Sequence, residues 1–265
     1  MDRPIGVFDS GVGGLTVVKE LMRFLPHEDI VYFGDTARVP YGIKSAETVT
    51  KFSIENILFL LNKNVKYVVV ACNTVSSLAL PALRRYIKVP LIGVISPGVK
   101  EAVSATKNKK IGVIATRSTV KSNAYMNEVK KIDAGISVYS VACPLFVPLA
   151  EEGWVQTDVA FEVAKTYLLP LKKKGIDTLI LGCTHYPLLK NVIGRALGKK
   201  IRLIDSARQV ALEVHQELNA YDLLSKKKEP ASYRFCVSDE PTLFKEWAER
   251  FLGYPIKNVE KCSYV

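Results

Sequence analysis

Three neighbouring residues, Cys183, Thr184 and His185, have side chains suited to moving protons at neutral pH. They follow the apolar, strand-like run Leu179–Leu181, and a helical pattern begins soon after them at Leu188. A thiol has a reference pKa of about 8.5, and a helix N-terminus or a nearby cation lowers that pKa. His185 can exchange a proton with the thiol, although a histidine at this place can equally well fill the core or cap a helix.

A second cysteine, Cys72, occupies the same kind of position. It ends the strand-like run Tyr67–Ala71 and is followed by Asn73, Thr74 and a helical pattern. Taken alone, either cysteine is best explained as a small apolar residue at the end of a buried strand. The pair, each with a threonine close by and each ahead of a helix, favours a shared function.

Two acid–base groups that approach one carbon atom from opposite sides can invert a stereocentre. One thiolate removes a proton from one face, and the other thiol returns a proton to the opposite face. Because both cysteines precede helices, we expect backbone N–H groups and the helix dipole to stabilise the thiolates. The pattern therefore predicts a two-sided proton shuttle, rather than a hydrolase nucleophile formed by Cys183 with His185 as its base.

A glycine-rich turn begins at Asp9 and Ser10. It resembles a dinucleotide-binding fingerprint, but Thr16 stands in the place of the third glycine, and no Gly-Lys-Ser/Thr follows as in a P-loop. Such a turn allows the backbone to approach a small carboxylate or ammonium group closely. Asp9 either caps the following helix or binds a substrate ammonium group and assists Cys72.

Two further polar segments stand out. Proline and glycine rigidify the loop Phe33–Gly42, where Tyr41 and Gly42 can present main-chain donors to an anion, and an ordinary turn is the alternative. An exposed helix end explains the pair Glu151 and Glu152 as well as a functional role does. The remaining cysteines lack polar company and are interpreted as structural or surface residues: Cys143, Cys236 and Cys262.

Short β-branched runs alternate with longer helical stretches, which predicts α/β units with parallel strands. The expected strands are Ile5–Phe8, Ile30–Phe33, Tyr67–Ala71, Leu91–Ile95, Lys110–Thr116, Ile136–Val141, Thr178–Leu181, a segment within Ile201–Ala207, and Tyr233–Val237. The expected helices are Leu15–Leu25, Ser45–Leu61, Ser76–Tyr86 with Pro81 within or bending it, Pro97–Ala105, Ser118–Lys130, Asp158–Lys173, one ending at Leu218, and Pro241–Phe251. The order of strand, polar turn and helix restarts at Lys110, so we expect an internal repeat of about 100 residues.

The predicted fold class is therefore α/β, with two pseudo-symmetric doubly wound parallel-sheet domains and the active site in the cleft between them. Residues 1–96 and 208–265 are expected to form the first domain, because the C-terminal segment returns to it, and residues 97–207 the second. In open α/β sheets, ligands bind beyond the carboxyl ends of the strands. The polar turns lie at such ends, including Thr116 and Thr119.

Composition limits the class of protein. The formal net charge is +11, but the lysines are scattered and lack interleaved aromatics, which favours a solvated surface over nucleic-acid binding. No apolar run approaches the roughly 20 residues of a membrane span, and the absence of a signal-peptide pattern predicts a cytoplasmic protein. Five cysteines without C-x-x-C and three histidines argue against a disulfide framework or a metal site.

Four motifs together resemble the glutamate racemase family of the aspartate/glutamate racemase superfamily, and the match covers essentially the whole length. They are Ile5–Gly14, Phe33–Gly42, Ala71–Thr74 and Leu181–Pro187. The resemblance implies a cofactor-independent isomerase that interconverts L-glutamate and D-glutamate, supplies D-glutamate for peptidoglycan, and forms a homodimer.

The resemblance also assigns roles to residues. It implies that Cys72 acts on D-glutamate and Cys183 on L-glutamate, with Asp9, Glu152 and His185 assisting the thiols. The substrate contacts that it implies are Asp9, Ser10, Tyr41, Gly42, Asn73, Thr74, Thr184 and His185, with Thr116 and Thr119 as further candidates.

Two alternatives stay open at the level of sequence. One is a racemase of the same superfamily that acts on aspartate or a related amino acid, because side-chain carboxylate recognition is not settled by these residues. The other is a two-lobed protein that binds a small molecule or nucleic acid without catalysis. In that case serine at Cys72 and Cys183 would leave function intact.

Overall fold

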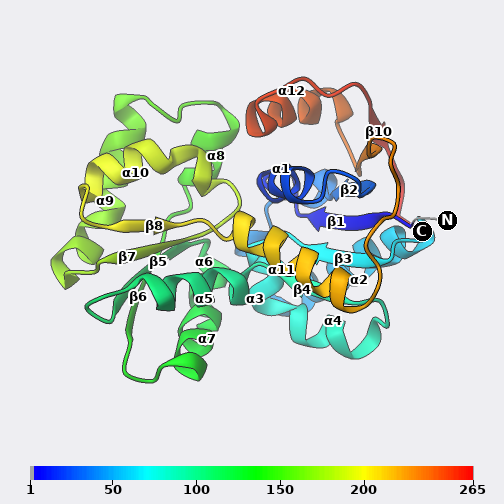
Figure 1. The fold of residues 1–265 in the computed structure, drawn as a ribbon. Helices are drawn as coiled ribbons and strands as arrows, with labels where there is room; N and C mark the ends of the chain where they lie inside the picture. The colour runs from blue at the N-terminus through cyan, green and yellow to red at the C-terminus, as the bar shows by residue number, and fades with distance from the viewer. Residues whose placement is uncertain (1–2, 265) are drawn as a thin grey trace.

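The computed structural model describes residues 3–264, and in that range the strands form two separate parallel β-sheets (Figure 1). The first sheet has the order β10-β9-β2-β1-β3-β4, and the second has the order β6-β5-β7-β8. The strands of the first sheet are β1 (Ile5–Asp9), β2 (Ile30–Gly34), β3 (Tyr67–Val70), β4 (Leu91–Gly93), β9 (Tyr233–Val237) and β10 (Val259–Lys261). Those of the second are β5 (Lys110–Ala115), β6 (Ser137–Ala142), β7 (Thr178–Gly182) and β8 (Arg202–Ile204).

The two sheets repeat one topology. The order β2-β1-β3-β4 in the first sheet corresponds to β6-β5-β7-β8 in the second, which agrees with the repeat expected from the sequence. Every strand pairing is parallel, and β1, β2, β3 and β7 are buried along their whole length. Buried parallel strands require helices on both faces of a sheet. The predicted fold class, two parallel-sheet α/β domains, is confirmed.

Helices cover these sheets. They are α1 (Leu15–Phe24), α2 (Ala46–Asn62), α3 (Asn73–Leu78), α4 (Leu80–Tyr86), α5 (Ile95–Ala105), α6 (Arg117–Lys121), α7 (Ala124–Ile132), α8 (Phe146–Glu151), α9 (Asp158–Lys174), α10 (Lys190–Leu197), α11 (Ser206–Ala220) and α12 (Pro241–Leu252). Short 3₁₀ turns cover Thr36–Arg38, Tyr41–Ile43 and Tyr186–Leu189. Several helices start at side-chain caps: the Ser45 hydroxyl accepts the N–H of Thr48 ahead of α2, and Thr157 does the same for Ala160 ahead of α9.

The structure differs from the elements expected from the sequence in three places. The expected helix Ser76–Tyr86 is two helices, because Pro81 stands in the first turn of α4, where its missing N–H costs nothing. The expected helix Ser118–Lys130 breaks at Asn123, which takes a left-handed conformation with φ 56°. The short edge strand β10 was not predicted at all.

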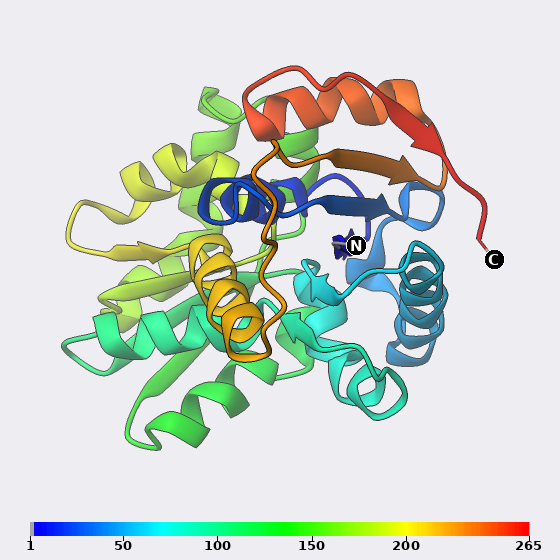
Figure 2. The same cartoon turned by 45° about the vertical axis from the view of Figure 1, so that its right-hand side comes forward.

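A continuous apolar core joins the two halves. Its buried members include Val18 and Leu21 of α1, Val210 and Val214 of α11, and Leu181 of β7. Helix α11 lies between the halves, and the chain then returns from it to β9 of the first sheet (Figure 2). The predicted domain limits, after residues 96 and 207, fall inside α5 and α11 and stay a prediction. Over residues 3–264, none of the helices has the length and apolar character that crossing a membrane requires.

Candidate active site

A cavity of about 480 Å³ opens where the carboxyl ends of strands from both sheets meet. Six of the residues predicted to contact substrate line it: Ser10, Tyr41, Gly42, Thr74, Thr116 and His185. Six more predicted residues are buried at the same strand ends: Asp9, Cys72, Asn73, Thr119, Cys183 and Thr184. The strand ends bring these twelve residues together, as expected for an open parallel sheet.

Cys72 occupies the position before α3 and is almost completely buried. Its Sγ atom lies 3.6 Å from the Ser10 hydroxyl oxygen, within hydrogen-bonding distance for sulfur. Burial, with the nearby Asp9 carboxylate adding to it, raises the pKa of the Cys72 thiol to about 12, although the N–H of Val75 and the side-chain hydroxyl of Ser10 act in the opposite direction. The helix start therefore acts on Cys72 in the expected direction, but burial outweighs it and the thiol is protonated at neutral pH.

Asp9 ends β1 and is fully buried. Its Oδ1 atom accepts the N–H of Gly11 at 3.0 Å, so it closes a local turn, while the residue before α1 is Gly14. Its Oδ2 atom is buried without a hydrogen bond of normal geometry to any described residue. Burial raises the pKa of Asp9, and the charge of His185 only partly offsets this effect. A buried carboxyl oxygen without a partner is a group that a ligand or a transferred proton can use.

Cys183 has acid–base partners of its own. Its Sγ atom lies 3.8 Å from Nδ1 of His185, and Nε2 of His185 lies 2.9 Å from a carboxylate oxygen of Glu151. Burial lowers the pKa of His185, but the contacts with Cys183 and Glu151 outweigh burial and raise it to about 10. His185 is therefore protonated at neutral pH.

The structure does not place the predicted assistant Glu152 at the cavity. Glu152 follows the last residue of α8 and is exposed, whereas Glu151 lines the cavity and contacts His185. Successive residues on a helix point about 100° apart, so only one of the two carboxylates can face the cavity. The backbone carbonyl of Glu151 also accepts a hydrogen bond from Arg250 of α12, which fixes the end of α8.

The glycine-rich turn packs the two halves together. A Cβ atom on Gly13 would lie 2.2 Å from Oγ1 of Thr184 and 2.5 Å from Nδ1 of His185. The side chain of Thr16 also reaches across, and its hydroxyl donates to the carbonyl of Thr184 at 3.2 Å. Because Gly13 has no side chain, His185 and Thr184 can pack against it. This packing role differs from the role expected from the sequence, which was a close approach of the backbone to a ligand.

Hydroxyl groups from both halves meet at the cavity. The hydroxyl oxygens of Thr74 and Thr116 lie 3.0 Å apart, and the Thr116 hydroxyl donates to the hydroxyl oxygen of Thr119 at 3.0 Å. Nearby, the Ser118 hydroxyl donates to the carbonyl of Gly42 at 2.9 Å. These contacts come from the segments that follow β2, β3 and β5, including the starts of α3 and α6, so they hold the two domains in a closed arrangement.

Asn73 is held from the opposite domain. Its side-chain amide donates to the phenol of Tyr125 at 2.7 Å, and both residues are buried. Tyr125 belongs to α7, which the sequence analysis did not connect to the site. The hydrogen bond fixes the amide of Asn73 next to Cys72.

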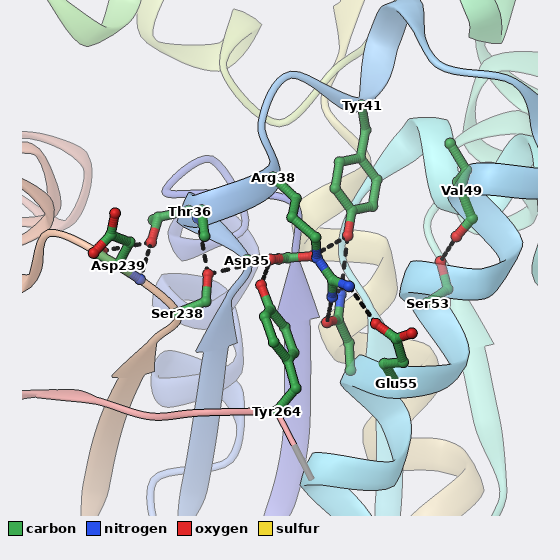
Figure 3. A network of polar contacts seen from close by, with 12 residues as sticks. Asp35, Thr36, Arg38, Tyr41, Val49, Ser53, Glu55, Ser238, Asp239 and Tyr264 are labelled. Carbon is green, nitrogen blue, oxygen red and sulfur yellow. Dashed lines mark hydrogen bonds and ion pairs between the residues drawn. The ribbon is translucent and has the colours of Figure 1, made fainter.

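A buried carboxylate, Asp35, organises the loop that carries Tyr41 and Gly42 (Figure 3). It accepts hydrogen bonds from Arg38 at 2.7 Å, from the phenols of Tyr41 and Tyr264, and from Ser238 at 3.1 Å. These partners come from the loop itself, the end of β9 and the C-terminal segment. The phenol of Tyr41 is therefore occupied by Asp35, which leaves its backbone as the part available to a ligand.

Comparisons with known proteins agree with this geometry. Residues 8–214 match the protein family described as Asp/Glu/hydantoin racemase. The chain belongs to the Asp/Glu/hydantoin racemase family.

Within this racemase family, the chain is similar to proteins named glutamate racemase. The one from Geobacter metallireducens is 49% identical over 261 residues, which is 98% of this chain and 97% of that one. The crystal structure of a glutamate racemase from Bacillus anthracis has a TM-score of 0.95 at 43% identity, covering 98% and 97% of the two chains. That of the Francisella tularensis glutamate racemase in complex with D-glutamate has a TM-score of 0.93 at 44% identity, covering 99% and 98%. The resemblance read from the four motifs is confirmed.

The racemase cavity has a wall that the motifs do not reveal. Three residues of α12 line it, Leu243, Phe244 and Trp247, facing Val147 and Pro148 of α8. Their only sequence signal is the apolar spacing of an ordinary helix, which a core-facing helix shows equally well. The ring of Phe251, one turn further along α12, packs edge-on against His185 with a centroid distance of 5.3 Å. Helix α12 thus closes the His185 side of the site.

Proposed function

We propose that this chain is a glutamate racemase, an isomerase that interconverts L-glutamate and D-glutamate through Cys72 and Cys183. The observation that carries the proposal is the placement of two buried thiols, one from each half, each in contact with a residue that lines the cavity: Cys72 with Ser10 and Cys183 with His185. Ser10 and Asp9 accompany Cys72, while His185 and Glu151 accompany Cys183. The two sulfurs also influence each other electrostatically.

The protonation states suit one direction of the reaction. Nδ1 of His185 lies 3.8 Å from Sγ of Cys183 and can exchange a proton with it, so Cys183 acts as the base that takes the Cα proton of L-glutamate. Cys72 is a neutral thiol, so it donates its proton to the opposite face of the same carbon. The C–H bond on one face breaks as the new C–H bond on the other face forms. The products are D-glutamate, a Cys183 thiol and a Cys72 thiolate.

The reverse reaction starts from that second state. Cys72 as thiolate removes the Cα proton of D-glutamate, and Cys183 as thiol reprotonates the carbon. Asp9, buried beside Cys72 with one free carboxyl oxygen, can take up or return the thiol proton or bind the substrate ammonium group. His185, hydrogen-bonded to Glu151, plays the matching part beside Cys183.

The Cα proton of an amino acid is only weakly acidic, so the site must stabilise a carbanion-like transition state. Preorganised donors around the α-carboxylate provide such stabilisation, and the predicted donors are the side chains of Asn73, Thr74 and Thr184. Ser10, the backbone of Tyr41 and Gly42, Thr116 and Thr119 complete the proposed substrate contacts. Closure of the two domains excludes water, which strengthens these interactions.

The wider setting is also part of the proposal. D-glutamate made here supplies peptidoglycan synthesis in the cytoplasm, and the enzyme needs no cofactor. We further propose a homodimer, because closed twofold assemblies are the commonest oligomers of soluble enzymes. The basic surface of scattered lysines attracts the anionic substrate and has no part in binding nucleic acid.

The test uses purified protein with L-glutamate in D₂O and no added cofactor, followed by circular dichroism and proton NMR. The proposal predicts loss of optical activity together with entry of deuterium at Cα. The racemisation rate of L-aspartate is measured under the same conditions, because aspartate is the competing substrate. Faster turnover of aspartate than of glutamate would overturn the choice of glutamate. No reaction with either amino acid at high enzyme concentration would reject a racemase altogether.

A further inference from the structure

Three potential metal ligands lie together at the edge of the first sheet, away from the racemase cavity. Cys236 is on β9, Glu260 is on β10, and Cys262 follows β10 directly. The two Sγ atoms and a carboxylate oxygen of Glu260 all lie within 4.8 Å of one another. The sequence analysis interpreted Cys236 and Cys262 as structural or surface residues without polar company, and it missed this grouping.

Strand pairing brings the three residues to one face. In the parallel pair β9/β10, Glu260 lies opposite Cys236, and the N–H of Cys262 donates to the carbonyl of Val237 at 2.8 Å. Residues two apart in a strand point to the same face, so Glu260 and Cys262 share a face. Cys236 and Cys262 pack against the same apolar cluster, which contains Phe33. The register of the edge strand thus fixes the three ligand atoms near one point.

We propose that Cys236, Glu260 and Cys262 form a binding site for a thiophilic divalent cation, of which Zn²⁺ is the best match. Zn²⁺ takes cysteine sulfur at about 2.3 Å and carboxylate oxygen at about 2.1 Å in tetrahedral geometry, which places two sulfurs about 3.8 Å apart. The observed grouping within 4.8 Å needs only a small adjustment to reach that arrangement. Mg²⁺ and Ca²⁺ prefer oxygen ligands alone and are poor matches.

Burial and charge support an ion at this place. Cys236 is buried, Cys262 is half-buried and Glu260 is exposed, so an ion can enter from solvent and keep a water molecule as its fourth ligand. Two thiolates and a carboxylate carry three negative charges, of which a divalent ion neutralises two. Lys63, which acts electrostatically on Cys236, offsets the remaining charge.

A disulfide is the competing chemistry for two neighbouring thiols. Cys236 and Cys262 are diagonal neighbours across the strand pair, because Cys236 lies opposite Glu260 and not opposite Cys262. Parallel strands lie about 4.8 Å apart and two residues advance about 6.6 Å along a strand, so diagonal Cα atoms lie about 8 Å apart, whereas a disulfide needs about 4.4–6.8 Å. A bridging metal spans the pair without moving the backbone, and a disulfide does not.

An ion here would affect the C-terminal segment and depend on pH. Tyr264, two residues after Cys262, donates its phenol proton to Asp35 of the network in Figure 3, so an ion that holds β10 also holds this contact. Metal binding displaces the thiol protons of Cys236 and Cys262, so it weakens as the pH falls.

The test measures metal binding directly. Cobalt(II) is titrated into the full-length Cys72→Ser/Cys183→Ser protein, so that the cavity thiols do not contribute, and zinc is then added as competitor. We expect one equivalent of Co²⁺ with thiolate-to-cobalt charge-transfer absorption, displaced by Zn²⁺, and an increase of the unfolding temperature by about 5–10 °C with Zn²⁺ in 100-fold excess over Kd. Adding Cys262→Ser should abolish the absorption, and the exposed Glu260→Gln should weaken binding at least tenfold.

Cys143→Ala in the same background is the matched control, because Cys143 lies outside the cluster and should leave the titration unchanged. Equal Co²⁺ binding with and without Cys262 would overturn the proposal. So would the absence of binding, or a mass spectrum after air oxidation in the presence of Zn²⁺ that shows loss of two hydrogen atoms and a Cys236–Cys262 disulfide.

Discussion

The contact between Glu151 and His185 gives the sharpest prediction, because the neighbouring Glu152 is a built-in control. We expect Glu151→Gln to lower kcat/KM about 10- to 100-fold. The substitution keeps the size of the side chain but removes the negative charge 2.9 Å from the imidazole. A hydrogen bond to a charged group contributes about 1.5–3 kcal/mol, and each 1.36 kcal/mol changes a rate tenfold. The pKa of His185 should fall from about 10 toward its ordinary value of 6.5.

Racemisation imposes a constraint on how this effect is measured. The two enantiomers have equal free energy, so kcat/KM must fall equally in both directions whichever thiol is impaired. The asymmetry appears in the primary isotope effects instead. If Glu151 and His185 serve Cys183, the isotope effect with L-glutamate deuterated at Cα should rise more than that with the D-enantiomer. Initial rates are followed by circular dichroism with four substrates: L-glutamate and D-glutamate, each with either protium or deuterium at Cα.

Glu152→Gln should leave both the rates and the isotope effects unchanged, because Glu152 is exposed and its side chain does not line the cavity. A loss of activity in Glu152→Gln that matches or exceeds that of Glu151→Gln would refute the assignment of Glu151. Unchanged kinetics in Glu151→Gln would refute the role of the imidazolium.

Further predictions follow from the packing around the site. Gly13→Ala should destabilise the fold by about 1–3 kcal/mol and lower kcat/KM, because the new Cβ atom would collide with Thr184 and His185. Urea unfolding measures the stability, and initial rates measure kcat/KM. Wild-type values of both quantities would contradict the close contact. Asp35→Asn should cost about 3 kcal/mol by breaking a buried ionic network and should raise KM more than it lowers kcat, because the loop of Tyr41 loses its anchor. The raised pKa of His185 means that the folded protein binds more protons than the unfolded chain between pH 6.5 and about 10. This stabilisation is complete below pH 6.5 and is lost as the pH rises toward 10, so the stability of wild type should fall over that window more steeply than that of Glu151→Gln.

The sequence was sufficient for the architecture because its signals are local. Apolar runs of four or five residues, each followed by a polar turn and a helical pattern, identified the strands β1, β3, β5 and β7 within one or two residues. Repetition of that order supplied the second sheet. By contrast, β10 is a three-residue edge strand with two charged members, and nothing in Val259–Lys261 distinguishes it from a loop.

Site residues could be predicted where a reactive residue type stands directly after a predicted strand. They could not be predicted where the direction of a side chain decides which of two neighbours faces the cavity. Cys72 and Cys183 follow the strands that place them. Glu151 and Glu152 are adjacent in the sequence, and only the rotation of α8 selects Glu151. The state of Cys72 also depends on tertiary burial, which overrides the expected effect of the helix start.

Long-range partners lay beyond the reach of local patterns. Tyr125 meets Asn73 across the domain boundary, and Tyr264 meets Asp35 from the far end of the chain. Each pair joins residues that no motif links. The same reason explains why Cys236 and Cys262 were not seen as neighbours.

The most direct test of two thiols on opposite faces uses a glutamate analogue with a leaving group at Cβ. Elimination from this analogue needs one base on one face, whereas racemisation needs both thiols. We predict that Cys72→Ser and Cys183→Ser each lose racemase activity. Cys72→Ser should still eliminate from the L-configured analogue, and Cys183→Ser from the D-configured one. Elimination from both enantiomers by either variant, or racemisation that survives in either, would contradict the two-thiol mechanism.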